Sequence, residues 1–393
     1  MVSAVLFITF FVLLVLNVPI SVCLGLSSAA AILYSGTSLT IVATNIYSGI
    51  SKFLLLAIPF FVLSGNIMAK AGISTRLIRF VDTCVGHHKG GIANVCIIVA
   101  CFFGAISGSG PATVAALGAV LIPAMVERGG FSAPFSTALM ATASSIAIVI
   151  PPSIAFVVYA SITGVSIGDM FMAGIVPGIL MGLALIVVVM LEVRKNHVVP
   201  SNVQKASAKE RLDAFKDAFW GFLMPVIILG GIYGGIFTPT EAAAVSVVYG
   251  LFVGMVIYKE VKLKDLWDIL IDSAKTTGGI MLIVACASLF SFVCTRFGIS
   301  TAASELLAKV AGNQFTFLLI CNVIFLIAGC FIDANSAMYI FIPIMLPVCK
   351  QLGYNVIAFG IMATVNLAIG QVTPPVGVNL FVAIGIKLET VSA

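Results

Sequence analysis

Two long apolar stretches of this chain are interrupted in the same way, first by small and polar residues and then by a pair of prolines. In the first half the interruptions are residues 107–111 (Ser-Gly-Ser-Gly-Pro) and the proline pair 151–152. In the second half they are residues 333–336 (Asp-Ala-Asn-Ser) and the proline pair 374–375. Broken helices expose backbone polar groups, which a membrane interior tolerates only where protein or a water-filled site covers them. Secondary transporters build their binding sites in this way, so the duplicated breaks predict an ion-transporter fold.

Composition places the chain in a lipid bilayer. Hydrophobic residues make up 61% of the 393 residues and charged residues only 9%, so we expect an all-α polytopic membrane protein. Residues 2–16 lack a basic region before their apolar run, which favours a first span over a cleaved signal peptide. The net charge is +5, but the basic residues lie in short connections between apolar runs, so no nucleic-acid partner is expected. The nine cysteines include no CxxC pair, and we interpret them as small hydrophobic residues.

A helix needs about 20 apolar residues to cross the hydrocarbon layer. Runs of this kind lie near residues 4–35 (with a candidate bend at residues 17–19), 50–70, 134–160, 172–192, 217–236, 240–258, 268–295 and 355–385. The runs at 91–106, 111–126, 315–331 and 336–350 are too short to cross. We therefore expect two re-entrant helical hairpins, over about residues 91–128 and 313–350, and two broken transmembrane helices, 134–160 and 355–385.

The two halves resemble each other beyond the breaks. Gly-Ile-Ser-Thr precedes each hairpin, at residues 72–75 and 298–301, and the polar stretch that follows is expected to form a helix along the membrane surface. An odd number of crossings separates equivalent points, so we expect two inverted repeats, residues 1–192 and 217–393, joined by a polar linker at 193–216. The second repeat ends without a counterpart of the span at 172–192, so its last helix is expected to be missing.

The distribution of Lys and Arg predicts the orientation. Most of the 20 lie on the side of the polar linker; the exceptions are Lys52, Arg296, Lys309 and Lys350. The positive-inside rule makes the linker side cytoplasmic. The N-terminus is then cytoplasmic, the first hairpin enters from the cytoplasm and the second enters from outside.

The proline pairs predict cation sites. Proline cannot donate a backbone hydrogen bond, so carbonyl groups one turn earlier lose their partners. Carbonyl and hydroxyl oxygens form a hard, neutral cage that suits a small monovalent cation such as Na+. One predicted site combines Ser107 with the carbonyl groups of residues 146–151, and the other combines the tip at residues 333–336 with residues 369–374. A proline kink resealed by waters and hydroxyl groups is the structural alternative.

The helix ends at the breaks predict an anion site. Ser109 in the first hairpin, and Asn335 and Ser336 in the second, are expected to cap the arms that follow them. Such N-termini carry about half a positive charge and unpaired N–H donors, so several of them together can hold an anion without a buried Arg. The residues expected to contact such an anion are polar or flexible positions near these ends: Ser109, Gly110, Thr113, Ser153, Ser336 and Asn366.

Other motifs have structural interpretations. Asp333 is the most deeply placed acid, with a role in the second site or as a helix cap. Thr238-Pro239-Thr240-Glu241 is typical of a capping box, and the glycines at 230, 231, 234 and 235 favour a close helix contact within the chain or with a partner. All three histidines lie in polar connections, and neither HExxH nor a P-loop occurs, so we expect no catalytic residues and no enzyme activity.

Taken together, these motifs resemble the large membrane subunit of tripartite ATP-independent periplasmic (TRAP) transporters over essentially the whole chain. They include ISGSGPATVAALG at the first tip, IVIPPS and VTPPVG at the breaks, and IFTPTEAAAV between the halves. The resemblance implies a Na+-driven importer of organic anions, such as sialic acid or a C4-dicarboxylate, in the bacterial inner membrane. It also implies two partners, a small four-helix membrane subunit and a periplasmic substrate-binding protein.

The resemblance further implies an elevator mechanism, in which residues 91–165 and 313–385 move as a transport block against a scaffold. It places cation ligands at Ser107, Ile146, Val149 and Pro151, with equivalents in the second repeat at Asp333, Asn335, Ile369, Val372, Thr373 and Pro374. Thr113 lies where some members of the family carry an acid, which leaves the substrate open. A stand-alone Na+/dicarboxylate symporter, and with less support a channel, are the alternatives.

Overall fold

The computed structural model describes residues 1–195 and 205–386, and these residues form helices joined by turns and short loops. Within this part of the chain, 7 helices are long and apolar enough to cross a membrane by length and composition. The expected all-α polytopic membrane protein is confirmed.

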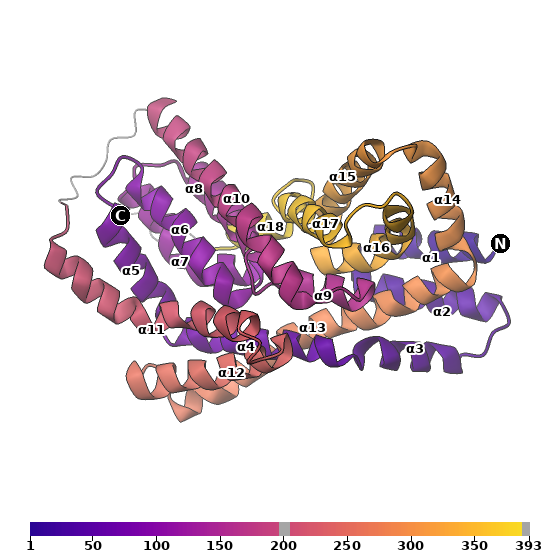
Figure 1. The fold of residues 1–393 in the computed structure, drawn as a ribbon, viewed down its shortest axis with the longest axis horizontal. Coiled ribbons are helices and arrows are strands. Elements are labelled where there is room, and N and C mark those ends of the chain that lie inside the picture. The colour runs from indigo at the N-terminus through magenta and orange to yellow at the C-terminus, as the bar shows by residue number, and fades with distance from the viewer. Residues whose placement is uncertain (196–204, 387–393) are drawn as a thin grey trace.

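One set of helices forms a long slab along the lower side of the view in Figure 1. We call this set the long-helix group; it comprises α1 (Val2–Val15), α2 (Ile20–Tyr34), α3 (Thr40–Ile50), η1 (Phe53–Leu56), α4 (Ala57–Lys70), α11 (Ala208–Tyr233), α12 (Pro239–Phe252) with a π-helical end (Val253–Ile257), and α13 (Leu263–Arg296). The single span predicted over residues 4–35 is wrong. Asn17 adopts a left-handed φ of 61° and Pro19 starts a new helix, so α1 and α2 are separate and pack against each other. The helix α3 was not predicted.

The second set contains the predicted hairpins and broken helices. We call it the hairpin group; it comprises α6 (Gly91–Ser107), α7 (Gly110–Glu127), α8 (Ala133–Ser145), η2 (Ile146–Ile148) and α9 (Ile154–Thr163) from the first half, and α15 (Gln314–Phe331), α16 (Ala334–Gln351), α17 (Val356–Gly370) and α18 (Val378–Ile384) from the second. The two halves of this group stand as separate lobes above the slab, with α9, α17 and α18 between them (Figure 1). The expected span at 172–192 is α10 (Ile167–Lys195), which packs on α6, α9 and α17.

Both breaks lie where the proline pairs predict them. Helix α8 ends before the first pair and α9 begins after it, while α17 and α18 flank the second pair. The Pro151-Pro152 and Pro374-Pro375 peptide bonds are both cis. Helices α7 and α15 each have 18 residues and meet the length criterion for a span. Length alone therefore does not establish that the hairpins are re-entrant, and this stays a prediction.

Two helices connect the groups, and each begins at one of the repeated Gly-Ile-Ser-Thr segments, where a helix is predicted; their position along the membrane surface stays a prediction. These are α5 (Ile73–Val85) and α14 (Ile299–Ala311), which begin after Gly72 and Gly298 with φ of 69° and 70°. Helix α5 packs against α6 and α11, so it touches both groups, whereas α14 packs mainly on α15 and α16. The two connecting helices are therefore attached differently.

The predicted caps are partly confirmed. Thr238 and Glu241 form the expected capping box at the start of α12. Ser109 is the N-cap residue of α7, but its side chain makes no capping hydrogen bond. The cap of α16 is Asp333 rather than Asn335 or Ser336, because the helix begins at Ala334.

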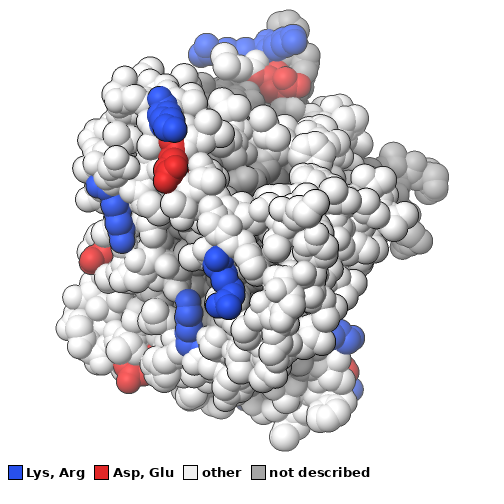
Figure 2. Space-filling view, turned by 90° about the vertical axis from the view of Figure 1, so that its right-hand side faces the viewer, with Lys and Arg blue, Asp and Glu red and all other residues white. Residues whose placement is uncertain are grey.

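The glycine motif at the end of α11 makes little helix contact within the chain. A Cβ added at Gly231 would meet the ring of Phe237, while a Cβ added at Gly230 or Gly235 would have no neighbour within 4 Å. Charged side chains are few on the face that Figure 2 shows, and uncharged residues cover most of it.

Candidate functional site

One cavity of about 330 Å³ brings the four interruptions together. Residues 108–111 line it from the first hairpin tip and residues 333–335 from the second. The flanks of the first break contribute Ile148, Ile154 and Ala155; the flanks of the second contribute Gln371 and Val378. The remaining wall is α13, through Lys275, Thr276, Gly279, Ile280 and Ile283. Segments far apart in the sequence therefore form one site, as the duplicated breaks predict.

Close backbone contacts hold each hairpin against its own break. A Cβ at Gly104 in α6 would lie 2.7 Å from the Cα of Ala147, and a Cβ at Gly370 in α17 would lie 2.5 Å from the Cα of Gly329 in α15. Only glycine allows two backbones to approach so closely. The same type of contact occurs at corresponding places in both halves, so each tip is fixed beside a proline pair.

The carbonyl groups before the first proline pair mostly have partners. The carbonyl of Ile146 accepts the N–H groups of Val149 at 2.9 Å and Ile150 at 2.8 Å. The carbonyl of Ile148 accepts the hydroxyl group of Ser153. The carbonyl of Val149 faces α10, where a Cβ at Gly174 would lie 2.6 Å from its oxygen. Pro151 is buried beside them.

The first hairpin tip is closed by hydroxyl groups. Ser107 and Thr113 share a hydrogen bond of 2.8 Å between their hydroxyl oxygens, and Thr113 also donates to the carbonyl of Ser109 at 2.9 Å. Ser107 and Thr113 are both buried, while Ser109 is half-buried and lines the cavity. The Ser107 oxygen is thus held beside the break but is already hydrogen-bonded.

The second tip has a carboxylate at its centre. Asp333 accepts the N–H groups of Asn335 at 3.0 Å and Ser336 at 3.2 Å, together with the hydroxyl group of Ser336. This is the helix-cap role that the sequence left open for Asp333. Asp333 also lines the cavity, so the capping carboxylate lies at the edge of the site.

The second break is more open than the first. Pro374 and Pro375 are exposed, and the carbonyl of Cys330 accepts the N–H groups of Val376 at 3.1 Å and Gly377 at 3.2 Å. The carbonyl of Ile369 accepts the N–H group of Val372 at 3.1 Å and the hydroxyl group of Thr373 at 2.8 Å. These bonds connect the break both to its own helix and to the tip of α15.

Three buried amide oxygens around the tips and breaks have no hydrogen-bond partner. They belong to Asn335, Gln371 and Asn379. Asn335 and Gln371 line the cavity, and a Cβ at Gly110 would lie 2.9 Å from the oxygen of Asn379. Buried polar atoms normally find partners, so oxygens without one indicate room for a cation or water. Sequence reasoning missed Asn379 and the side chain of Gln371. Gln371 lies within the predicted segment 369–374, so its amide had a local signal.

The residues predicted to contact an anion separate into two sets. Ser109 and Gly110 line the cavity. The others are buried and already paired: Thr113 with Ser107, Ser153 with the carbonyl of Ile148, Ser336 with Asp333, and Asn366 with the side chain of Asn322 at 2.6 Å. Their predicted contact with substrate remains a prediction.

A second cavity of about 370 Å³ adjoins the first. It lies between α4 and the first hairpin, and Ser107, Ser109, Asn66 and Thr276 are among its lining residues. Ser109 and Thr276 line both cavities, so the first tip separates two spaces along α13. No cluster of three or more His, Cys, Asp or Glu that could hold a metal occurs in residues 1–195 and 205–386. A transition-metal site has no support there.

Comparison of the sequence with known proteins finds similarity to transport proteins. Residues 7–392 match the family described as "Tripartite ATP-independent periplasmic transporter, DctM component". The C4-dicarboxylate TRAP transporter large permease protein DctM of Pseudomonas aeruginosa is 43% identical over 362 residues, covering 91% of this chain and 84% of the relative.

Other relatives carry other substrate names. The isethionate TRAP transporter permease protein DctMQ of Oleidesulfovibrio alaskensis is 42% identical over 392 residues, covering 99% of this chain and 61% of the relative. The 2,3-diketo-L-gulonate TRAP transporter large permease protein YiaN of Escherichia coli is 36% identical over 374 residues, covering 93% of this chain and 87% of the relative. Permeases of this similarity are thus named for different small organic acids.

Proposed function

Because this chain belongs to the family of DctM components, the large permeases of TRAP transporters, we propose that it carries a small organic anion across the membrane together with Na+. It is a transporter component rather than an enzyme. Its relatives are named for C4-dicarboxylates, isethionate and 2,3-diketo-L-gulonate, and sialic acid belongs to the same class of small acids. We propose a carboxylate of this size as the substrate.

The observation that carries the proposal is the single cavity between the two tips and the two breaks. Its volume of about 330 Å³ lies at the lower end of the range for small-molecule pockets. The N-termini of α7 and α16 begin at its wall, at Gly110 and Ala334, and their half-charges favour an anion. Transporters with discontinuous helices place substrate and coupling ions at such a position.

We propose that Na+ binds on either side of this cavity. The first proposed site is formed by Ser107, Ile146, Val149 and Pro151; the second by Asp333, Asn335, Ile369, Val372, Thr373 and Pro374. The partnerless oxygens of Asn335 and Gln371 support the second site, because neutral oxygens near a carboxylate suit a hard cation. The carbonyl group of Ile146 in the first site already accepts two backbone N–H groups, so Na+ there would share this oxygen with them.

We further propose that the two halves are inverted repeats and that the transporter works as an elevator. The repeats would be residues 1–192 and 217–393, with a transport block of residues 91–165 and 313–385. Corresponding features support the repeat: two glycine-preceded connecting helices, two close glycine contacts and two proline-pair breaks. The separation of the hairpin group from the long-helix group supports the moving block.

Two partners complete the proposed importer, a small four-helix membrane subunit and a periplasmic substrate-binding protein. The family description names a tripartite, periplasmic system, and the DctMQ relative is longer than this chain. The multi-pass chain would lie in the bacterial inner membrane with its N-terminus in the cytoplasm.

Reconstitution of the permease with both partners in liposomes tests this function. Uptake of radiolabelled succinate should require an inward Na+ gradient and the soluble binding protein. If K+ replaces Na+ without loss of uptake, the sodium coupling is wrong. If uptake proceeds without the soluble protein, the chain is a stand-alone symporter instead.

A further inference from the structure

Lys275 supplies the positive charge that the hairpin tips of the proposed substrate site lack. Two charged side chains line the cavity, Asp333 on the second tip and Lys275 on α13. The polar residues on the tips and breaks are neutral apart from Asp333, so an entering carboxylate would meet one negative charge there. Lys275 supplies the opposite charge from the facing wall.

The position of Lys275 along its helix calls for an explanation. It lies about 18 Å along α13 from Leu263, well inside a helix that spans the molecule. It is the last charged residue before the uncharged stretch 276–295, on the side that the basic residues predict to be cytoplasmic. The ammonium group lies 3.6 Å from the carboxylate of Asp272, but both side chains are mostly exposed, at 73% and 69%, so this pair is weak.

We propose that Lys275 binds the carboxylate of the transported anion in the cavity. The anion would lie between the ammonium group and the N-terminus of α7 at Gly110, with Thr276 beside it. This inference rests on the proposed function and adds a residue that determines which ligands enter, because an uncharged molecule gains nothing from Lys275.

The location of Lys275 on the long-helix group has a second consequence. The tips belong to the hairpin group, so the contact with Lys275 exists only while the hairpin group stands beside this part of α13. The site would then bind the anion more tightly in this arrangement than after a displacement of the hairpin group. A fixed charge facing a moving site gives the anion different affinities for two states, and such a difference shifts the balance between them.

Uptake by three variants in the reconstituted transporter tests the inference. Lys275→Met should raise the apparent KM for succinate about 10-fold to 100-fold, because a charge-assisted hydrogen bond to its carboxylate is lost. Lys275→Arg should retain most of the affinity because it keeps the charge. Lys264→Met, in the first turn of the same helix and outside the cavity, is the matched control and should match the unchanged protein.

Chemical modification tests the same charge without any transport. Thr276 lines both cavities, so the cysteine in Thr276→Cys should react with methanethiosulfonate reagents in the purified protein. The reaction of the native cysteines in the unchanged protein is subtracted. Adding Lys275→Met should lower the rate ratio of the anionic ethylsulfonate to the cationic trimethylammonium reagent about fivefold.

The outcomes separate the two proposals. If the unchanged protein takes up no succinate, the proposed function fails. If it does transport succinate and Lys275→Met has an unchanged KM, only the role of Lys275 is overturned. An unchanged reagent ratio, or a cysteine at residue 276 that reacts with neither reagent, also overturns that role, whatever the uptake shows.

Discussion

Gly370 is the residue at which a single added atom has the clearest cost. Its Cβ would lie 2.5 Å from the Cα of Gly329, closer than real Cβ contacts allow. Gly370→Ala should therefore force α15 and α17 apart and lower the free energy of unfolding by about 1–3 kcal/mol. Thermal denaturation of the purified protein in detergent measures the change. Gly230→Ala, where nothing lies within 4 Å, serves as the control; equal stability of the two variants would contradict the close contact.

Lys52 joins the two groups of helices by one hydrogen bond. Its ammonium group, just before η1, donates to the carbonyl of Ser161 near the end of α9 at 2.7 Å, and burial lowers the pKa of Lys52. Lys52→Met should cost about 1 kcal/mol of stability, because the carbonyl of Ser161 near the C-terminal end of α9 loses its charged donor. The same denaturation assay checks this. Lys309→Met, exposed in the last turn of α14, should have no effect.

Residue roles could be predicted where the partners are neighbours in the sequence. The capping box of Thr238 and Glu241 needs only four consecutive residues, and it is confirmed. Lys275 and Asn379 were missed because their neighbours come from remote elements: the tips for Lys275, and Gly110 for Asn379. Positions of this kind follow from tertiary packing, which no local pattern contains.

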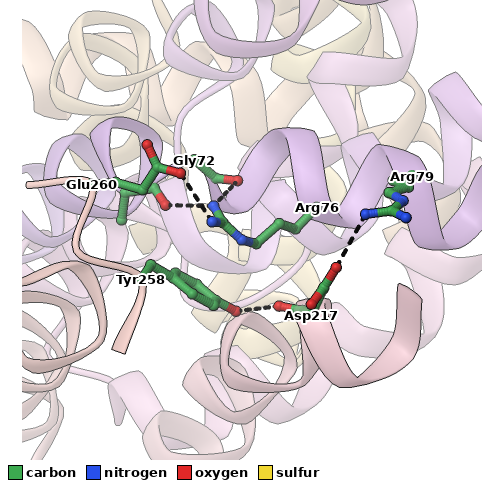
Figure 3. Close-up of polar contacts among 7 residues, drawn as sticks. Gly72, Arg76, Arg79, Asp217, Tyr258 and Glu260 are labelled. Atoms are coloured by element: carbon green, nitrogen blue, oxygen red, sulfur yellow. Dashed lines mark hydrogen bonds and ion pairs between the residues drawn. The ribbon is translucent and has the colours of Figure 1, made fainter. Parts of the chain in front are cut away.

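At the scale of elements, two arginines attach α5 to the long-helix group, and Arg76 makes more contacts than Arg79 (Figure 3). Arg76 pairs with Glu260 at 3.0 Å, donates to the carbonyls of Ala71 and Gly72 at 3.1 Å, and lies 3.9 Å from the ring centroid of Tyr258. Arg79 makes one exposed ion pair with Asp217 at 3.1 Å.

The two arginines should therefore respond differently to substitution. Arg76→Met should lower the free energy of unfolding by about 1–2 kcal/mol, since it removes hydrogen bonds and a cation–π contact together. Arg79→Met removes an exposed pair and should cost less than about 0.5 kcal/mol. Thermal unfolding of both variants at low and high salt checks the contrast. Equal losses would mean that Arg76 contributes no more than a surface ion pair.

Most elements follow from apolar run length and from proline and glycine. The hairpin arms, the two connecting helices and the breaks lie where the sequence predicts them. The first predicted span divides in two at the candidate bend, residues 17–19, because Asn17 takes a left-handed conformation and the chain starts a new helix there. Helix α3 mixes polar and apolar residues, so no run marks it.

For the whole molecule, the proposed elevator predicts that a bond between the groups stops transport. The ideal Cβ position of Gly65 in α4 lies 3.8 Å from the Cβ of Ser107 in α6, within the normal range for a disulfide. The double variant Gly65→Cys with Ser107→Cys should lose most Na+-driven uptake on oxidation and regain it on reduction. Comparing both states of one variant removes the effect of losing the Ser107 hydroxyl group.

A bond within the long-helix group is the matched control. A Cβ at Gly25 in α2 would lie 3.6 Å from the Cβ of Cys286 in α13, so Gly25→Cys alone should form a disulfide with a native cysteine. Transport should survive that oxidation. Undiminished uptake by the oxidised double variant, with the bond verified by mass spectrometry, would exclude motion between α4 and α6.

The common cavity was the largest-scale feature that sequence reasoning reached. Matching interruptions indicated that the tips and breaks meet, and the structure brings them around one space. The wall formed by α13 could not be predicted, because helix packing between the groups leaves no periodic signal in either segment.

In the proposed elevator, helix α5 would also limit how far the hairpin group can travel. Arg76 and Arg79 fix its first turns to the long-helix group, while Asp82 pairs with Arg128 at the end of α7 at 2.8 Å. If that pair opens, only the short connection between Val85 and Gly91 can extend. Six peptide steps reach about 20 Å when stretched. The connection between Val85 and Gly91 therefore limits how far the hairpin group could move away from α5. A larger displacement would have to unwind α5 itself.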